Sequence, residues 1–269
     1  MVSALLIAVA LFTAAIPAWG RGGQVRQLCL LCHPVHYVEH GRCVDCHRGN
    51  AASERKNIAH AGLREGKYAN FMLGNQIELR DGQRLLDTLA CRRCHVSGGR
   101  GNRLAVNLDS SVIRKSAGEI ALLVRHPVAN MPDFALTEAQ ITTLVNTLLA
   151  GSVGREMAVS GPVRVHFNTT GKSGADVFSR KCGSCHRLLS ERFGASGTGA
   201  IGPNLSGLFS VYYPETFRNN LPWTGRRLST WLKNPREIKP WSRMLPVALT
   251  AAEMKELDGI LSITPGADR

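Results

Sequence analysis

Apolar residues recur three and four positions apart in two stretches of the chain, which is the spacing of one face of an α-helix. They are Ile141, Leu144, Val145 and Leu148 in the first stretch, and Met254, Leu257, Ile260 and Leu261 in the second. A capping box opens each stretch. Its residues are Thr137 with Gln140, and Thr250 with Glu253. The pattern predicts one amphipathic helix in each stretch, the first ending at Gly151.

The two stretches belong to an internal repeat. In the first copy LVRHP precedes MPDFALTEAQ, and in the second WLKNP precedes MLPVALTAAE, so both fit M-x-x-x-A-L-T-x-A-[Q/E]. A match over ten positions indicates duplication. Another helix is expected ahead of each copy, in DGQRLLDTLACRRCH and in SGADVFSRKCGSCH. The sequence therefore predicts a mainly α fold.

The first twenty residues differ in kind from the rest of the 269-residue chain, because they are apolar, carry no charge and end in small residues. They resemble a signal peptide cleaved before Arg21, so we expect export to the periplasm. No Lys or Arg precedes the apolar run, and retention as an anchor is the alternative. This segment offers the one expected route to membrane association, since no second stretch approaches the roughly 18 apolar residues of a spanning helix.

All eight cysteines occur in CxxC pairs, and a histidine follows each pair directly. The pairs are Cys29 and Cys32, Cys43 and Cys46, Cys91 and Cys94, and Cys182 and Cys185, followed by His33, His47, His95 and His186. Residues i, i+3 and i+4 share a face of one helical turn, so two sulfurs can reach one porphyrin edge while the histidine reaches the iron. C-x-x-C-H is typical of c-type haem attachment. Zinc sites and disulfides also use cysteine pairs, but neither accounts for the four histidines. We expect four haem c groups, each with its iron.

With these motifs the chain resembles a multihaem, here tetrahaem, c-type cytochrome. Only nine residues separate His33 from Cys43, and a segment as short as 21–64 cannot bury enough apolar surface to fold unaided. Two haems are expected to serve as its core. The resemblance to dihaem units implies two histidine ligands for each iron. Of the three spare histidines we favour His36 and His60 as the second ligands, with His40 as the alternative.

The repeat resembles a class I cytochrome c in its order of helix, haem motif, middle helix, methionine loop and final helix. This resemblance implies that Met131 is the sixth iron ligand opposite His95, and Met244 the one opposite His186. It also implies that the Pro203 carbonyl in IGPNL accepts the Nδ1 proton of His186. The first copy has RGNRLAVNLD instead, which leaves the corresponding partner of His95 open.

The expected organisation follows from these resemblances. It comprises a signal peptide at 1–20, a loop-rich dihaem segment at 21–64, and two small class I cytochrome c-like helical domains with His/Met haems at 65–152 and 153–269.

Periplasmic electron transfer through four haems is the expected function, and a carrier is favoured over an enzyme. Methionine ligation raises a haem potential above that of a bis-histidine haem, so electrons are expected to enter at the dihaem segment. The alternatives are a haem reductase that acts on a small oxyanion or peroxide at an open iron, and a fixed subunit of a larger reductase or outer-membrane conduit. The layout is loosely similar to cytochromes of metal-, selenite- or tellurite-reduction systems, which implies a place in anaerobic respiration.

The net charge of +13 indicates an anionic partner. Four arginines, at positions 92, 93, 100 and 103, cluster around the third motif. No aromatic ladder accompanies them, so nucleic acid is not expected. Redox proteins with acidic docking surfaces are the expected partners, and a solvated face is the alternative.

Overall fold

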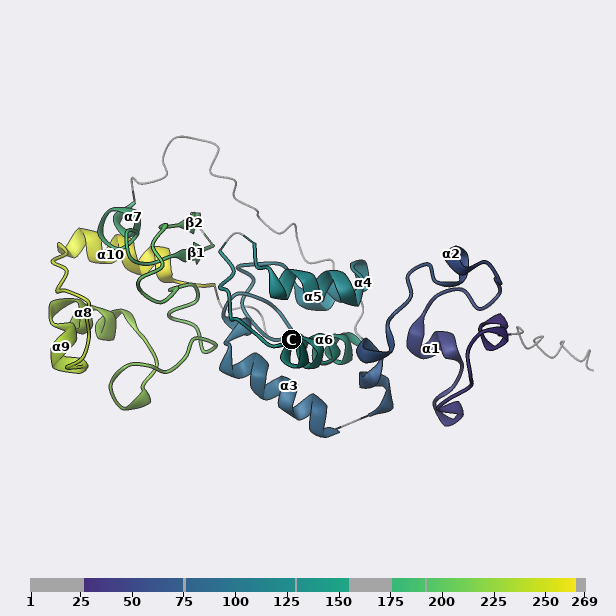
Figure 1. Cartoon of the computed structure of the whole chain (residues 1–269). Coiled ribbons are helices and arrows are strands. Elements are labelled where there is room, and N and C mark those ends of the chain that lie inside the picture. The colour runs from purple at the N-terminus through teal and green to yellow at the C-terminus, as the bar shows by residue number, and fades with distance from the viewer. Residues whose placement is uncertain (1–26, 75, 129, 155–175, 192, 265–269) are drawn as a thin grey trace, which may run out of the picture.

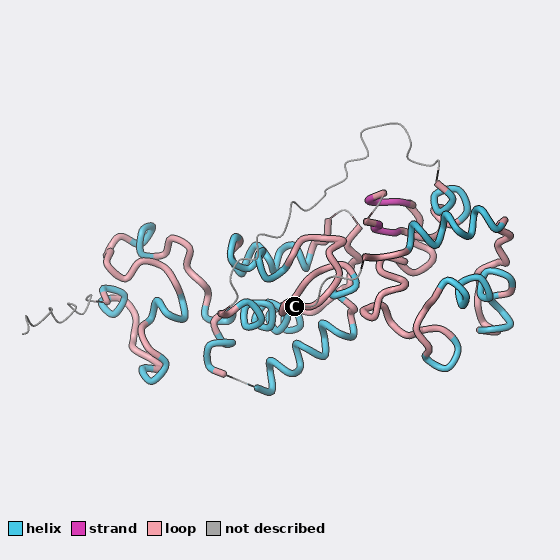
Figure 2. Tube along the Cα trace, turned by 180° about the vertical axis from the view of Figure 1, so that it is seen from behind, coloured by secondary structure: helices cyan, strands magenta, loops and turns pink. Residues whose placement is uncertain are grey.

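The computed structural model describes residues 27–74, 76–128, 130–154, 176–191 and 193–264. The expected signal peptide at 1–20 lies outside these residues. The described chain forms a row of three parts (Figure 1), which we call the head (27–64), the middle part (65–154) and the C-terminal part (176–264). Helices predominate over strands, and long loops connect them (Figure 2).

Ten α-helices and one two-stranded sheet are found among the described residues. The helices are α1 (Cys43–His47), α2 (Lys56–Ala59), α3 (Gln76–Thr88), α4 (Leu108–Arg114), α5 (Ala117–Arg125), α6 (Glu138–Ser152), α7 (Val177–Lys181), α8 (Gly225–Lys233), α9 (Pro235–Ile238) and α10 (Ala251–Leu261), and the antiparallel strands are β1 (Leu188–Ser190) and β2 (Gly194–Ser196). Short 3-10 turns occupy 28–31, 38–40, 66–68, 70–73, 91–93 and 218–220.

The head has no protein core. No residue from 27 to 63 is buried, and Leu31, Val35 and Val38 are each more than half exposed. Two short helices and two 3-10 turns cannot hold one another without apolar contact, since helical stability in proteins comes mainly from packing. The protein side chains alone therefore do not account for this part of the fold.

The middle part is built around α6, which packs on α3 and also contacts α4 and α5. Its core consists of side chains from these helices and from the turns at 66–73, namely Tyr68, Phe71, Leu86, Val112, Ala117, Ile120, Ala121, Ile141, Leu144, Val145, Leu148 and Leu149. The fully buried Asn146 ties those turns to α6, because its amide accepts from the Phe71 N–H at 3.0 Å and donates to the Lys67 carbonyl at 2.7 Å.

The C-terminal part has a separate core between α7, α8, α10 and the β1–β2 hairpin. Its buried members are Val177, Phe178, Cys182, Leu188, Leu208, Tyr213, Leu228, Leu232, Leu257, Ile260 and Leu261. The α7 helix meets α10, and the Glu256 carboxylate accepts from the first N–H of α7, that of Val177, at 3.0 Å. This pairing of a first and a last helix corresponds to α3 on α6 in the middle part.

The helical predictions are confirmed and some of their boundaries are corrected. Both capping boxes are present, at the start of α6 and of α10. Gly151 lies inside α6, so the prediction that it ends the helix was wrong; Gly154, with φ +71°, follows the end instead. The helix expected to run into CRRCH stops at Thr88, because Ala90 adopts a left-handed conformation with φ 51° before the motif begins a new turn. Among the described residues, no helix combines the length and apolar character needed to cross a membrane.

Gly82 allows the close approach of α3 to α6. A Cβ atom at this position would lie 2.9 Å from Thr147 Cβ and 3.2 Å from a Thr143 methyl group. We therefore expect Gly82→Ala to lower the free energy of unfolding by about 1–3 kcal/mol, because overpacking outweighs the gain of roughly 1 kcal/mol in helix propensity. Urea unfolding of the haem-loaded protein measures this.

Gly118→Ala in α5 is the matched control for this substitution. A Cβ atom there meets nothing closer than 3.9 Å, so its free energy of unfolding should stay constant or rise by up to about 1 kcal/mol. Equal losses in both variants would show that the α3–α6 contact is not the cause.

Candidate haem sites

All four CxxCH motifs adopt one helical turn. The histidine N–H bonds to the carbonyl of the first cysteine at 3.0 Å in the first motif, 3.0 Å in the third and 2.9 Å in the fourth, and the second motif forms α1. In this conformation the two cysteine side chains and the histidine ring share a face. The predicted geometry of the motifs is therefore present at every one of them.

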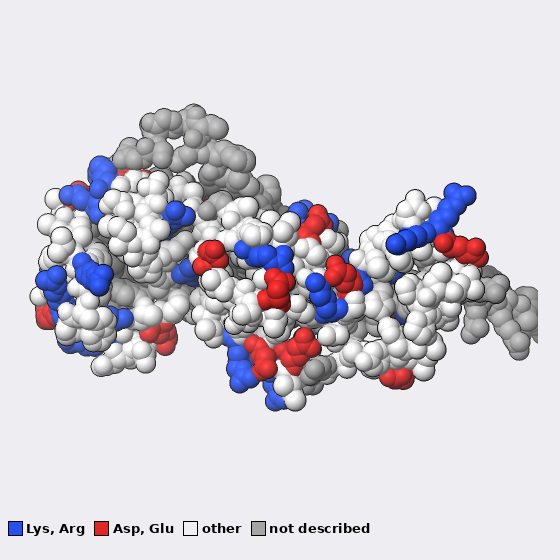
Figure 3. All heavy atoms as spheres, in the orientation of Figure 1, with Lys and Arg blue, Asp and Glu red and all other residues white. Residues whose placement is uncertain are grey.

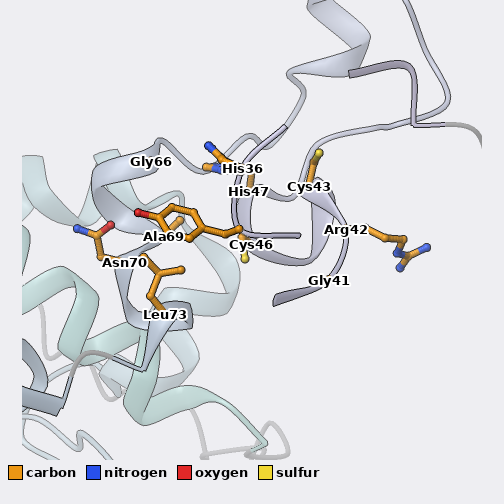
Figure 4. Close-up of a pocket in the computed structure, with 11 residues that line it drawn as sticks. His36, Gly41, Arg42, Cys43, Cys46, His47, Gly66, Ala69, Asn70 and Leu73 are labelled. Atoms are coloured by element: carbon orange, nitrogen blue, oxygen red, sulfur yellow. Dashed lines mark hydrogen bonds between the residues drawn. The ribbon is translucent and has the colours of Figure 1, made fainter. Parts of the chain in front are cut away.

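The head brings its histidines together in two pairs. His36 Nε2 lies 3.4 Å from His47 Nε2, with 5.6 Å between ring centroids, and the rings of His33 and His60 are 6.0 Å apart (Figure 4 shows the first pair). Metal–imidazole bonds are about 2 Å long, so an iron between two ring nitrogens would hold them about 4 Å apart. The spacing of the first pair is slightly shorter than this.

His40 lies apart from these pairs. Its Nε2 is 3.7 Å from the Glu39 carboxylate, and its ring meets that of Tyr37 edge-on at 6.2 Å. The structure thus places His36 and His60, rather than His40, opposite the two motif histidines of the head.

A hollow beside α1 tests whether a haem fits the head. Its lining includes both cysteines of the second motif, His36 and His47, and four residues from the start of the middle part, namely Gly66, Ala69, Asn70 and Leu73 (Figure 4). Attachment sulfurs and two facing imidazoles therefore border one space. The donor set and its arrangement fit a covalently attached haem.

Three motif histidines donate a hydrogen bond from Nδ1 to a main-chain carbonyl. The acceptors are Arg64 O for His47 at 3.1 Å, Val106 O for His95 at 2.7 Å and Pro203 O for His186 at 2.8 Å. Because a carbonyl only accepts, each Nδ1 carries the proton and each Nε2 is free to bind a metal. The Pro203 bond is as predicted, and Val106 is the partner of His95 that the sequence left open.

Buried Arg64 holds the second motif against the middle part. Its Nη1 donates to the Cys46 carbonyl at 3.0 Å, and its main-chain N–H donates to the His47 carbonyl at 2.6 Å. Its guanidinium lies 4.9 Å from the centre of the Phe71 ring. No motif or pattern distinguishes this arginine among the 33 Lys and Arg residues.

Burial governs the ionisation of the middle and C-terminal motifs. It raises the pKa of the Cys91 and Cys182 thiols to about 11 each, and it raises that of Cys94 as well. As free thiols these groups are protonated at neutral pH. Burial also lowers the pKa of His95, so its imidazole is neutral, which is the form that binds metals.

The two candidate methionine ligands lie in the loops before α6 and α10. Met244 is half-buried, and its sulfur accepts from Trp231 Nε1 at 3.1 Å. Met131 is half-buried and its N–H donates to the Val128 carbonyl at 3.2 Å. Their role as iron ligands remains a prediction from the repeat.

One surface prediction needs correction. Arg92 is buried, with its guanidinium bound to Asp87, Gln83 and the Ser97 carbonyl, so it cannot belong to an exposed basic patch. Near Met244, Trp223 and Trp231 pack edge to face with centroids 5.7 Å apart, whereas Trp241 is 79% exposed.

The chain has recognisable relatives. The family model described as "Cytochrome C oxidase, cbb3-type, subunit III" matches residues 77–146, which include the third motif and Met131. A cytochrome c of Kluyveromyces lactis is 29% identical over 82 residues, and one of Stellaria longipes is 30% identical over 82 residues; these cover 70% and 71% of the relatives and 27% of this chain. The chain belongs to the cytochrome c family.

This membership makes the chain a c-type cytochrome that transfers electrons through haem c and its iron. A cbb3-type domain also indicates redox proteins as partners of this cytochrome. No solved structure matches the chain.

Gly202 sets the position of the His186 ring in this cytochrome. A Cβ atom at Gly202 would lie 2.5 Å from His186 Nδ1 and 2.8 Å from Nε2. We expect Gly202→Ala to push the ring off the Pro203 carbonyl and to reduce the low-spin haem signal of the loaded protein, measured by EPR and visible spectra.

The neighbouring Ile201, 88% exposed, supplies the control. Ile201→Ala should keep the spectrum of the parent protein. An unchanged spectrum in Gly202→Ala would mean that the ring does not bind iron in this position.

Proposed function

We propose that this cytochrome is an exported, periplasmic electron carrier with four covalent haems, two in the head and one in each of the other parts. The observation that carries the proposal is the pairing of both head histidines of CxxCH motifs with a second histidine, His36 or His60. The bound haems supply the redox chemistry, each iron taking up or releasing one electron. The protein residues attach, orient and enclose them.

The lack of a protein core in the head supports two haems there. Between residues 27 and 63 no side chain is buried, while the same stretch contains four cysteines and brings four of its five histidines together in pairs. A domain of this size needs a covalent or metal-based support to fold. Haem attachment provides both, so the head is expected to fold only when loaded.

The repeat supports one haem in each remaining part. Both have a first helix, a motif turn, a histidine with its Nδ1 held by a carbonyl, and a capped final helix that follows a methionine loop. With His95/Met131 and His186/Met244 ligation, these haems would have higher potentials than the bis-histidine pair. The difference would favour electron flow from the head towards the C-terminal part.

The exposed basic residues of the C-terminal part support an acidic redox partner. Residues 218–243 contain seven Lys or Arg and one Glu. Figure 3 shows Lys and Arg side chains gathered over α8 and α9, the helices that precede the Met244 loop. Complementary charge speeds encounter and fixes orientation, so a partner with an acidic face would dock here.

Replacement by alanine at two positions, His36→Ala and His40→Ala, tests the ligand pairing in the head. In the loaded full-length protein His36→Ala should convert one low-spin iron into a high-spin iron that binds carbon monoxide, because its facing imidazole is gone. His40→Ala should leave every iron low-spin. EPR integration separates the two. The reverse result would assign the ligand to His40 and reject the pairing.

Met131→His and Met244→His test the methionine ligation. Each should lower the potential of one haem by a sizeable part of the about 0.8 V range that axial ligands span. Met254→Leu is the control, because Met254 packs against the C-terminal core. A potentiometric titration that is the same in Met244→His and Met254→Leu would exclude Met244 as a ligand.

A further inference from the structure

The sites of His95 and His186 meet at one arginine. Arg93 stands between Cys91 and Cys94, and its Nη1 donates to the Asn204 carbonyl at 3.0 Å across 111 positions of sequence. Asn204 directly follows Pro203, whose carbonyl holds His186 Nδ1. A side chain from one attachment motif therefore binds the loop that orients the histidine of the next.

The Asn204 carbonyl accepts from a second donor as well. The Tyr213 hydroxyl lies 3.3 Å from the same oxygen, and the Arg93 guanidinium lies 5.6 Å from the centre of the Tyr213 ring. Tyr213 is only 8% exposed, so this contact is shielded from water. Hydrogen bonds from a charged donor are stronger than neutral ones, and more so where water is excluded.

The Asn204 side chain reaches the methionine loop of the middle part. Its Nδ2 donates to the Asn130 carbonyl at 3.2 Å, and Asn130 directly precedes Met131. Its Oδ1 accepts from the Ser206 N–H at 2.9 Å and from the Ser206 hydroxyl at 2.6 Å, which fixes the amide. Asn204 therefore contacts the third motif through its carbonyl, which accepts from Arg93, and the Met131 loop through its side chain.

A third contact closes the interface beside Arg93. Buried Asn102 donates to the Arg93 carbonyl at 2.9 Å and to the Ser210 hydroxyl at 2.8 Å. Gly207, with φ +75°, passes so close that a Cβ atom would lie 2.6 Å from the Arg93 carbonyl. The backbones of the two parts are therefore in direct contact at this point, and only glycine fits there.

We propose that Arg93 and Asn204 are positioning residues that lock the His95 and His186 sites into one rigid unit. Arg93 holds the His186 loop against the Cys91–His95 turn, and Asn204 holds it against the Met131 loop. The two sites are then fixed in distance and orientation, as fast electron exchange between neighbouring centres requires. The inference rests on the proposed function in that both sites are taken to hold a haem. It assigns Arg93, which is half-buried, to the contact between the two parts rather than to a docking patch.

Arg93→Ala in the loaded full-length protein tests this, with Arg103→Ala as the matched control that removes an equal charge from an exposed position. Loss of a charge-assisted hydrogen bond changes an equilibrium by roughly tenfold or more. We expect amide hydrogen exchange in residues 204–210 to accelerate about tenfold in Arg93→Ala, and the EPR spectrum of the His186 haem, which belongs to the other part of the chain, to shift. Arg93→Lys, which keeps a cationic donor, should restore most of both.

Tyr213→Phe is the second variant, since it removes only the hydroxyl that shares the Asn204 carbonyl. It should change the exchange rates and the EPR spectrum in the same direction but by less. It keeps the test decisive if Arg93→Ala does not fold. Exchange rates and spectra in Arg93→Ala and Tyr213→Phe that equal those of Arg103→Ala would overturn the inference. The haem content of the parent protein is measured separately. A missing haem at Cys182 and Cys185 would reject the proposed function. Four haems together with unchanged variants would reject only the positioning role of Arg93 and Asn204.

Discussion

The helical turn of the CxxCH motif is the constraint on which the rest of the structure depends. A bond from the histidine N–H to the carbonyl of the first cysteine sets two sulfurs and one imidazole on the same face at each motif. In the head the fold consists of little else, since no side chain from 27 to 63 is buried. There the proposed haems would supply the core, while the middle and C-terminal parts have a core of their own around α6 and around α10.

Main-chain carbonyls do the positioning that side chains do in many metal sites. Arg64, Val106 and Pro203 each offer a carbonyl to the Nδ1 of a motif histidine, which fixes the tautomer and leaves Nε2 free to bind a metal. Two arginine side chains form hydrogen bonds close to these carbonyls. Arg64 clamps the second motif to the start of the middle part, and Arg93 binds the residue after Pro203. Both arginines thus bind at borders between parts of the chain, although the sequence predicts a surface patch for Arg93 and no role for Arg64.

The sequence was sufficient for features that local patterns encode. The motif turns, the helices α6 and α10 with their capping boxes, and the Pro203 bond were all predictable, because each depends on residues close together in the chain or on a proline segment of known form. The pairing of His36 with His47 was one of several arrangements that spacing allowed.

Other features were beyond reach for physical reasons. Val106 acts through its carbonyl, which carries no residue identity, so no motif could mark it. The sequence does not distinguish Arg92 from an exposed arginine, because its burial depends on hydrogen bonds to Asp87 and Gln83 that form only in the folded chain. Gly151 stays helical because α6 packs along its length, and tertiary contact overrides the local tendency of glycine to end a helix.

The number of covalent haems per chain tests the central claim most directly. Intact-mass spectrometry of the denatured protein, combined with haem quantitation of the pyridine complex, counts thioether-bound groups without reference to ligands or potentials. The account predicts four haems on every mature chain. A chain that carries one haem, confined to the peptide with Cys91 and Cys94, would contradict it and reduce the protein to a single cytochrome domain with three unused motifs.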